Sequence, residues 1–179
     1  YRGRDSRNLR RRARQYTGVA KELRERATDE AGLEHLIEQA QHAARQILNR
    51  FDYVGTIAVE FFQIGTGEDA TLVANEIAPR VHNTGHWTIE GAETSQFENH
   101  MRAVMGMELG SAAPVGHSAM VNIIGDEPRP GALESMPEAH VHMYGKSPRA
   151  GRKIGHVTLN APSADELDAL LERFTRVIG

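Results

Sequence analysis

The 179-residue sequence contains no cysteine, so disulfides, thiolate catalysis and cysteine-ligated zinc or iron–sulfur sites are excluded. It also has no apolar run near the roughly 18 residues that a membrane span needs, and no apolar segment typical of a secretory signal. Hydrophobic residues make up 40% and charged residues 25% of the chain, which indicates a globular protein rather than a collagen-like or disordered one. We therefore expect a cytoplasmic protein with no membrane partner.

Positive charge is in short supply outside the first 26 residues. These residues hold nine arginines and Lys21 against three acidic residues, a net charge of +7, whereas the rest of the chain carries −10. Residues 1–27 show neither helical nor strand periodicity, and only Tyr1 and Tyr16 are available to stack on bases. A poorly ordered terminus is therefore favoured over a nucleic-acid-binding arm.

The hydrophobic pattern of the first half predicts a helix followed by a β-hairpin. Apolar residues at three- and four-residue steps predict a helix to about Arg50, with Thr28 as its N-cap. The β-rich runs 53–62 and 70–77 flank a glycine-containing turn and predict two antiparallel strands. Because the first run is almost continuously apolar, we expect it to be covered on both faces.

The second half alternates short strands with turns and ends in a helix. The pattern predicts a short helix from Thr94 or Ser95, a linker at 110–116, strands at 118–124, 139–143 and 154–160, and a last helix that begins at a capping box on Ser163. No internal repeat is found. The fold class predicted from these elements is α+β with antiparallel strands.

Two glutamates interrupt the apolar runs of the predicted hairpin. Glu60 and Glu76 each lie among apolar neighbours, and a carboxylate is almost never buried without a partner. The hairpin allows them to face one another, where two like charges need a cation between them. Oxygen ligands from both glutamates and Asn75 suit Mg²⁺ or Mn²⁺ rather than zinc. An arginine salt bridge to one glutamate is the structural alternative, and the spacing favours neither.

A polar loop follows the second strand of the hairpin and is the next candidate for chemistry. Residues 75–88 are rich in side chains that form hydrogen bonds, and loops held by a rigid sheet commonly carry sites. His82 and His86 have the i, i+4 spacing of a helical zinc pair. Because Pro79 precedes them and Gly85 lies between them, a zinc-binding helix is disfavoured.

A cluster of cations lies near the C-terminus, at Lys146, Arg149, Arg152 and Lys153, with glycines interspersed. Fixed cations on a flexible backbone suit a phosphate clamp, although a solvated basic loop is the more usual meaning of such a run. Gly145-Lys146-Ser147 is not a P-loop, since His140 stands where that motif needs glycine. Gly65-x-Gly67 lies in a hairpin and is no dinucleotide fingerprint.

Several of these stretches together resemble a known family. Asn75-Glu76-Ile77-Ala78-Pro79-Arg80-Val81-His82-Asn83-Thr84-Gly85-His86-Trp87-Thr88, followed by Ser95-Gln96-Phe97-Glu98, is similar to the motif of the N5-carboxyaminoimidazole ribonucleotide synthases. These are ATP-grasp enzymes of bacterial and fungal purine biosynthesis. Val59-Glu60-Phe61-Phe62, Asn122-Ile123-Ile124-Gly125 and the segment from Tyr144 to His156 also resemble the family. The resemblance runs from about residue 28 to 179.

The resemblance implies the C-terminal part of an ATP-grasp domain over residues 28–112 and a small β-rich C-terminal domain over 113–179. Residues 1–27 are then an atypical segment outside the fold. The implied reaction is the ATP-dependent carboxylation of 5-aminoimidazole ribonucleotide with bicarbonate, which gives the N5-carboxyamino product, ADP and phosphate. Full-length family members are expected to be homodimers.

The resemblance also implies roles for the candidate residues. Glu60 and Glu76 are the Mg²⁺ ligands, and Asn75 and Glu76 lie at ATP. Arg80 and His82 are catalytic, with Arg80 holding bicarbonate or carboxyphosphate. Lys146, Arg152 and Lys153 bind substrate or nucleotide phosphates.

The sequence departs from the family before Thr28, where the full enzyme has an N-terminal domain and a central ATP-grasp subdomain. We therefore expect a truncated and inactive chain, whose opening segment comes from a shifted reading frame or an aberrant start. One alternative function is a non-catalytic protein that binds RNA or another anionic ligand through the arginine-rich arm. Another is a divalent-metal hydrolase that turns over without ATP.

Overall fold

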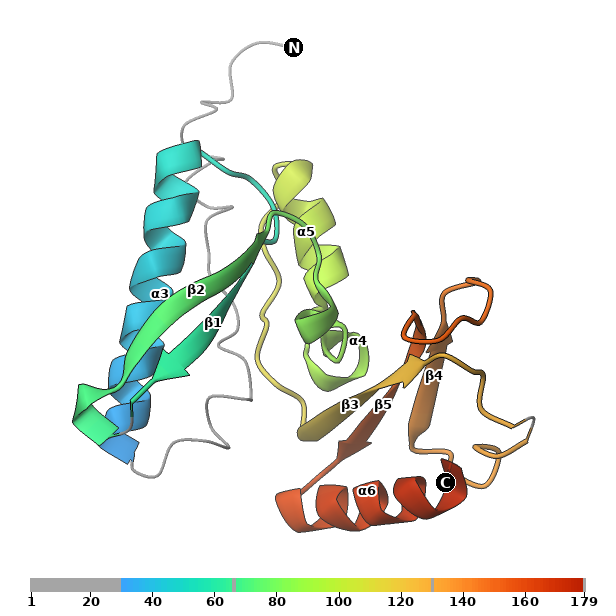
Figure 1. Cartoon of the computed structure of the whole chain (residues 1–179). Helices are drawn as coiled ribbons and strands as arrows, with labels where there is room; N and C mark the ends of the chain where they lie inside the picture. The colour runs from blue at the N-terminus through green and yellow to red at the C-terminus, as the bar shows by residue number, and fades with distance from the viewer. Residues whose placement is uncertain (1–29, 66, 130, 179) are drawn as a thin grey trace. The chain divides into compact units, whose positions relative to one another are not determined.

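The computed structural model describes residues 30–65, 67–129 and 131–178, and its contacts divide the chain into two compact units (Figure 1). The first unit takes the residues up to His86 together with Gln96–Ala112. The second takes Trp87–Ser95 and the residues from Ala113 onward. The predicted disordered terminus and the Thr28 cap lie outside the described residues. No helix in the described ranges is long and apolar enough to cross a membrane.

The first unit begins with helix α3 (Glu30–Phe51), as the apolar periodicity predicts. Its buried side chains are spaced four residues apart, at Leu36, Ala40, Ala44 and Leu48. Residues at this spacing lie on one face of a helix, so α3 has a single packing stripe.

Helix α3 packs along a hairpin made of β1 (Ala58–Ile64) and β2 (Thr71–Ala78), which the short 3-10 helix η1 (Gly67–Asp69) connects (Figure 1). The Gln39 side chain joins the two elements. Its Oε1 accepts from the Leu72 amide at 3.1 Å, and its Nε2 donates to the Ala70 carbonyl at 3.3 Å. The helix thus covers one face of the hairpin.

The prediction that the first strand is covered on both faces is wrong. Phe62 and Val73 are cross-strand partners, and they are 58% and 51% exposed. The reason is that the sheet in this part of the structure has two strands, and the described residues place α3 against one of its faces.

Strand β1 also begins later than predicted, at Ala58 instead of residue 53. Gly55 has a φ of +129°, which interrupts an extended strand, and the Thr56 amide donates to Nδ1 of His100 at 3.0 Å instead of to a neighbouring strand. A Cβ on Gly55 would lie 2.8 Å from that same nitrogen. Gly55 and Thr56 are therefore held by helix α5 rather than by the sheet.

Helix α5 (Gln96–Val104) occupies the position of the short helix predicted from Thr94 or Ser95. It buries Asn99 and Ala103 and leaves Met101 and Val104 about half exposed, so the apolar side chains do not form its packing face. Asn99 is buried because it is paired with Gly110. Its Nδ2 donates to the Gly110 carbonyl at 3.1 Å, and its Oδ1 accepts from the Gly110 amide at 2.9 Å.

The second unit is a three-stranded antiparallel sheet in the order β3-β5-β4, with helix α6 packed across it. Its elements are α4 (Thr88–Gly91), β3 (His117–Ile124), β4 (Ala139–Met143), β5 (Lys153–Ala161) and α6 (Ala164–Ile178). All but α4 were predicted. The core lies between sheet and helix and includes Val157, Leu159 and Phe174. The Ser163 hydroxyl accepts from the Glu166 amide at 3.3 Å, which confirms the predicted cap.

Candidate functional site

Glu60 and Glu76 lie opposite each other in the register of the β1–β2 hairpin. This pairing confirms the prediction that the two glutamates face one another. Directly opposed like charges destabilise an antiparallel pair. The arrangement therefore needs a compensating group of positive charge.

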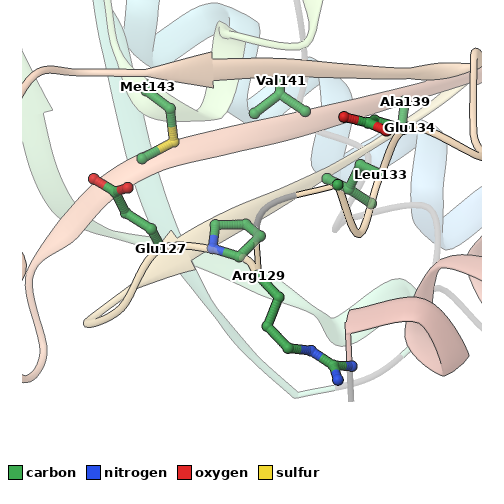
Figure 2. A pocket seen from close by; sticks show the side chains of 9 residues that line it. Glu127, Arg129, Leu133, Glu134, Ala139, Val141 and Met143 are labelled. Carbon is green, nitrogen blue, oxygen red and sulfur yellow. The ribbon is translucent and has the colours of Figure 1, made fainter.

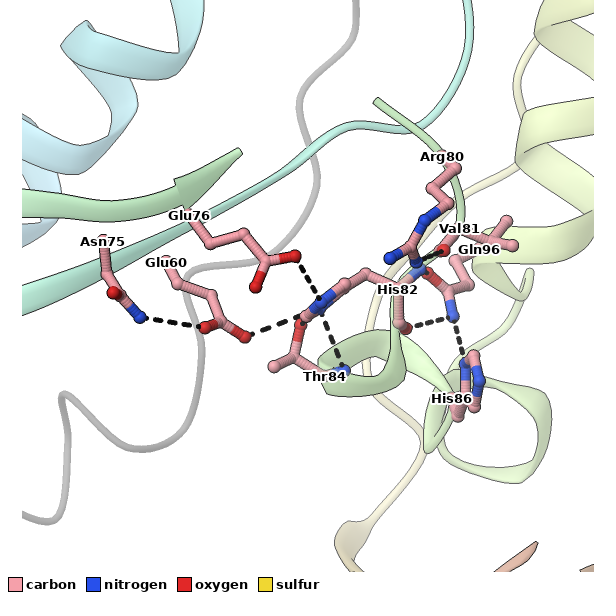
Figure 3. Close-up of polar contacts among 9 residues, drawn as sticks. All are labelled: Glu60, Asn75, Glu76, Arg80, Val81, His82, Thr84, His86 and Gln96. Carbon is pink, nitrogen blue, oxygen red and sulfur yellow. Dashed lines mark hydrogen bonds and ion pairs between the residues drawn. The ribbon is translucent and has the colours of Figure 1, made fainter. Parts of the chain in front are cut away.

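A β-bulge beside this pair brings in a third polar side chain. The register runs from Glu60↔Glu76 to Phe61↔Ala74, so Asn75 is the extra residue of the bulged strand. Its Nδ2 lies 3.4 Å from Oε2 of Glu60 (Figure 3). The bulge thus places Asn75 with the two carboxylates instead of on the opposite face of the sheet.

The imidazole of His82 approaches both carboxylates (Figure 3). Its Nδ1 lies 3.7 Å from Oε1 of Glu60, and its Nε2 lies 3.9 Å from Oε1 of Glu76. The His82 side chain is only 11% exposed, whereas Glu60 is 35% and Glu76 is 53% exposed. The expectation that both glutamates are buried is therefore wrong, because the hairpin face that carries them is open to solvent.

The arginine salt bridge that the sequence left open as an alternative is not found among the described residues, where the arginine ion pairs are Arg102–Glu98 and Arg173–Glu138. Arg80 follows β2 by two residues, and its side chain is exposed. The guanidinium donates to the Val81 carbonyl at 3.0 Å. Among the described residues, the side chain that approaches both carboxylates is thus that of His82.

The loop that carries His82 is held by Gln96, the first residue of α5. The Gln96 Oε1 accepts from the His82 amide at 3.0 Å, and its Nε2 lies 2.8 Å from the His82 carbonyl and 2.7 Å from Nδ1 of His86. A Cβ on Gly85 would lie 2.6 Å from Gln96 Oε1, so a larger residue there would displace the Gln96 side chain. Gln96 is part of the motif that resembles the synthase family, but the residue patterns gave it no role.

The two histidines of this loop do not share a helix face. His82 is the N-cap of the 3-10 helix η2 (Asn83–Gly85), where it lies 3.0 Å from the Thr84 hydroxyl, and His86 is the residue after that helix. The His86 ring instead stacks obliquely on Phe97, with 5.1 Å between ring centroids. The two histidines therefore contact different partners: His82 contacts Thr84, and His86 packs on Phe97.

The donor set of the site fits magnesium chemistry. The described residues contain no group of three or more His, Asp or Glu side chains that could hold a metal by themselves. Mg²⁺ is typically held by one or two carboxylates and completes its octahedron with waters and substrate phosphates. Two facing carboxylates with an adjacent asparagine side chain suit such a shared ion.

The predicted basic cluster lies in the second unit, on the loop between β4 and β5 and at Lys153, the first residue of β5. Arg152 donates from its guanidinium to the carbonyl and hydroxyl oxygens of Ser147, at 3.3 and 3.2 Å. The loop is also pinned to Gly125, whose carbonyl accepts from the Arg149 amide and whose amide donates to the Arg152 carbonyl. Lys146 and Lys153 are exposed. The convergence of these cations with the loop of the first unit stays a prediction.

A hollow of about 360 Å³ lies elsewhere in the second unit (Figure 2). Val141 and Met143 of β4 form one wall, and Glu127, Leu133 and Glu134 come from the segment before that strand. None of the site residues predicted from the sequence lines it.

The chain matches two known domain families. Residues 15–97 match the ATP-grasp domain, and residues 118–170 match the phosphoribosylaminoimidazole carboxylase C-terminal domain. The first match begins at residue 15, inside the arginine-rich segment. The similarity therefore starts earlier in the chain than residue 28, where the motifs placed its start.

Individual relatives point to one enzyme family. The chain is 50% identical over 139 residues to N5-carboxyaminoimidazole ribonucleotide synthase from Pseudomonas aeruginosa, a match that covers 78% of this chain and 38% of the relative. The synthetase from Thermus thermophilus has a similar structure, with a TM-score of 0.74 and 50% identity over 86% of this chain and 41% of the other.

The structure of the synthase from Aspergillus clavatus, in complex with ADP and 5-aminoimidazole ribonucleotide, gives a TM-score of 0.67 at 37% identity. The matched region covers 79% of this chain and 39% of the Aspergillus clavatus chain. The chain thus spans about two-fifths of the length of the relatives that it matches.

Proposed function

Because residues 15–97 belong to the ATP-grasp domain family and residues 118–170 to the phosphoribosylaminoimidazole carboxylase C-terminal domain family, we propose that this chain supplies part of the active site of an ATP-dependent carboxylase. The substrate is 5-aminoimidazole ribonucleotide, and the carboxyl group comes from bicarbonate. The proposal follows from the synthases that the chain resembles and from the chemistry of the β1–β2 hairpin.

The facing pair Glu60 and Glu76 carries the proposal. When bound, a divalent cation would neutralise negative charge on the phosphoryl group that ATP transfers to bicarbonate. The two carboxylates would hold that ion, and Asn75 would place its amide beside the nucleotide. Both carboxylates are partly exposed, as an ion shared with a substrate requires.

His82 and Arg80 have complementary roles in the proposed site. His82 lies between the carboxylates and, through the Gln96 bonds to its backbone, fixes the start of the loop. Arg80 is exposed, and its guanidinium offers the planar fork that suits bicarbonate or carboxyphosphate. We propose that Arg80 orients the carboxyl donor and that His82 keeps the carboxylates in place before the cation binds.

The basic loop of the second unit would bind phosphate. Lys146 and Lys153 are exposed, while Arg152 is held by Ser147 at one edge of the same loop. Cations mounted on a pinned loop lose little freedom when they bind an anion, which favours affinity. We assign the phosphate of the ribonucleotide or of the nucleotide to these three side chains.

The cation site is tested with the 179-residue chain by titrating Mn²⁺, followed by electron paramagnetic resonance, in the presence and absence of ADP. We expect binding that ADP strengthens, and a loss of at least tenfold in Mn²⁺ affinity in Glu60→Gln and Glu76→Gln, which is about 1.4 kcal/mol or more. Glu108→Gln is the matched control, because Glu108 is an exposed glutamate of the same unit. Equal affinity in all four proteins would refute the proposed metal site.

A further inference from the structure

The two faces of the β3-β5-β4 sheet differ in chemistry. One face packs on α6 through apolar side chains such as Val157 and Leu159. Since side chains alternate along a strand, the residues between these point to the other face. In the register, His156 of β5 pairs with Asn122 of β3 on one side and with His142 of β4 on the other. A row of polar side chains therefore crosses the second face.

The β5 residues of this polar face are buried. His156 is 1% exposed and Thr158, two residues further along β5, is fully buried. Helix α4 lies close to the neighbouring strand, because a Cβ on Gly91 would lie 2.2 Å from the Ser118 hydroxyl. Polar groups are buried at a cost unless they are hydrogen-bonded, so contacts within the structure must hold the histidines.

The histidines belong to one line of contacts that begins at α4. Oε1 of Glu90 lies 2.6 Å from Nε2 of His142. The His142 ring is stacked on that of His156, with centroids 4.6 Å apart and planes at 16°. Nδ1 of His156 then lies 2.6 Å from the hydroxyl of Tyr144, which follows β4 directly. Four titratable side chains thus connect the buried sheet to the start of the basic loop.

The line ends at Lys146. Its Nζ lies 5.3 Å from the centroid of the Tyr144 ring, within the range of a cation–π contact. Tyr144 is half-buried while Lys146 is exposed. The ring therefore forms a platform for the ammonium group, and the hydroxyl bond to His156 holds that platform in one orientation.

We propose that Tyr144 and His156 are positioning residues, which hold Lys146 in place to receive a substrate phosphate. A lysine side chain has four rotatable bonds and loses their freedom when it binds an anion. A ring fixed from the buried side lowers that loss in advance, because Lys146 is already restricted before the ligand arrives. Glu90 and His142 complete the support, since His142 stacks on His156 and is itself fixed by Glu90. The phosphate ligand of Lys146 rests on the proposed function, whereas the positioning does not.

The first test uses the small number of lysines in the chain, which are Lys21, Lys146 and Lys153. Reductive methylation with ¹³C-formaldehyde keeps the positive charge of the lysines and gives each one its own NMR signal, assigned by Lys→Arg variants. We expect the Lys146 signal to be displaced upfield by the Tyr144 ring. Tyr144→Leu should remove the displacement, and Tyr144→Phe and His156→Asn should reduce it, while the Lys153 signal stays in place.

The matched control for this test is Thr158→Val. Thr158 is buried on the same strand and face as His156, and its hydroxyl has no hydrogen-bond partner among the described residues. The near-isosteric valine should leave the Lys146 signal unchanged. The proposal is overturned if the signal is not displaced in the unsubstituted protein, or if Tyr144→Phe and His156→Asn both leave it where it was. Tyr144→Phe removes a single hydroxyl, so the test survives a failure of His156→Asn to fold.

The second test joins positioning to binding by a double-mutant cycle. 5-Aminoimidazole ribonucleotide and ADP are titrated separately into the chain, with the Lys146 signal as the readout, and the affinities are repeated in a Lys146→Met background by calorimetry. We expect Tyr144→Phe to weaken binding of the ligand that Lys146 contacts by up to about two- to fivefold, because the ring stays but is no longer fixed, and one exposed cation–π contact sets the upper limit. In the Lys146→Met background the same substitution should have no further effect.

The failures of the two ideas are distinguishable. An equal loss of affinity in both backgrounds would overturn the positioning role, because a merely structural effect does not depend on Lys146. If neither ligand moves the Lys146 signal in the unsubstituted chain, the phosphate assigned to Lys146 under the proposed function is overturned. The methyl NMR comparison then still decides whether Tyr144 and His156 position this lysine.

Discussion

The Nδ2 atom of Asn75 lies 3.4 Å from Oε2 of Glu60, across the two strands of one hairpin. Regular alternation would direct Asn75 away from the face that carries its neighbour Glu76. The bulge between Glu60 and Phe61 in the register removes this constraint, since it leaves Asn75 without a cross-strand partner. One additional residue in β2 thus brings a side-chain amide beside a pair of carboxylates.

Deleting Asn75 should therefore separate the carboxylate pair from the amide. The shortened strand would keep Glu76 opposite Glu60 and regain regular alternation, so the hairpin should still form. We expect Mn²⁺ affinity without nucleotide to change less than threefold, about 0.6 kcal/mol, while the increase that ADP causes is lost. The measurement is the Mn²⁺ titration with and without ADP.

Asn75→Ala serves as the control for this deletion, because it removes the amide and keeps the bulge. Both variants should behave alike if the amide is what contacts the nucleotide. A deletion that abolishes metal binding altogether would contradict the prediction, and would mean that the bulge itself sets the distance between the two carboxylates.

The pairing of Glu60 with Glu76 could be predicted from the sequence because the turn between the runs is short and an antiparallel register follows from it. The bulge could not, since nothing in the side chains around Asn75 specifies an extra residue. The exposure of the hairpin was also mispredicted. A run of apolar residues such as that around Phe62 indicates which side chains a sheet could bury. It does not show which of them other elements of the structure cover.

Contacts between distant segments were the other part that the sequence could not supply. Gln96 holds the His82 loop and His156 supports Tyr144, and in each case the partner is defined by the fold and not by a local pattern. By contrast, the helices α3 and α6 were predictable, because their periodicity and the Ser163 cap are encoded within a few turns of chain. Gly85, whose Cβ would strike Gln96, hints at such a contact, but glycine alone is too common a signal.

Gly85→Ala should release the loop that carries His82. The new Cβ would displace the flexible end of Gln96 and break its bonds to the His82 backbone, at a cost of about 1–3 kcal/mol. We expect faster hydrogen exchange at the His82 amide and a lower urea midpoint. Gln96→Ala should produce the same effect by itself.

The double variant decides whether the two substitutions act through one contact. Gly85→Ala should add little to Gln96→Ala, because residues that share a partner are not additive. Gln46→Ala is the control, since Gln46 lies on the outer surface of α3 and its side-chain amide contacts the exposed His42. Fully additive losses would show that Gly85 is required for another reason.

Tyr53→Phe should loosen the connection between the start of the hairpin and the loop after it. The Tyr53 hydroxyl lies 2.7 Å from the Pro79 carbonyl and 3.0 Å from that of Thr56. Loss of this hydroxyl should lower the free energy of unfolding by about 1 kcal/mol at neutral pH. The measurement is urea unfolding of both proteins.

The same variant has a predictable pH dependence. Burial raises the pKa of Tyr53 in the folded chain above its usual value of about 10. The folded state therefore keeps a proton that the unfolded state releases, so the stabilisation is complete below about pH 10 and is lost as the pH rises through the folded pKa. We expect the stability difference between the unsubstituted protein and the Tyr53→Phe variant to narrow above about pH 10. A difference that widens there would contradict the raised pKa.

A chain of these 179 residues alone should not carboxylate 5-aminoimidazole ribonucleotide. It spans about two-fifths of the length of the synthases that it resembles, and phosphoryl transfer depends almost wholly on positioning and charge neutralisation. Misplacement of the reacting groups by about 1 Å can cost roughly 10²-fold in rate, so a site that holds the nucleotide from one side should be inactive even where it binds the metal.

The measurement is phosphate release from ATP with bicarbonate, with and without the ribonucleotide. Metal and ADP binding without turnover is the expected result, and Glu76→Gln should weaken the metal binding at least tenfold. Turnover comparable to that of an intact synthase would show that the facing glutamates, Arg80 and the basic loop suffice for catalysis. Turnover without ATP would instead favour a metal-dependent hydrolase.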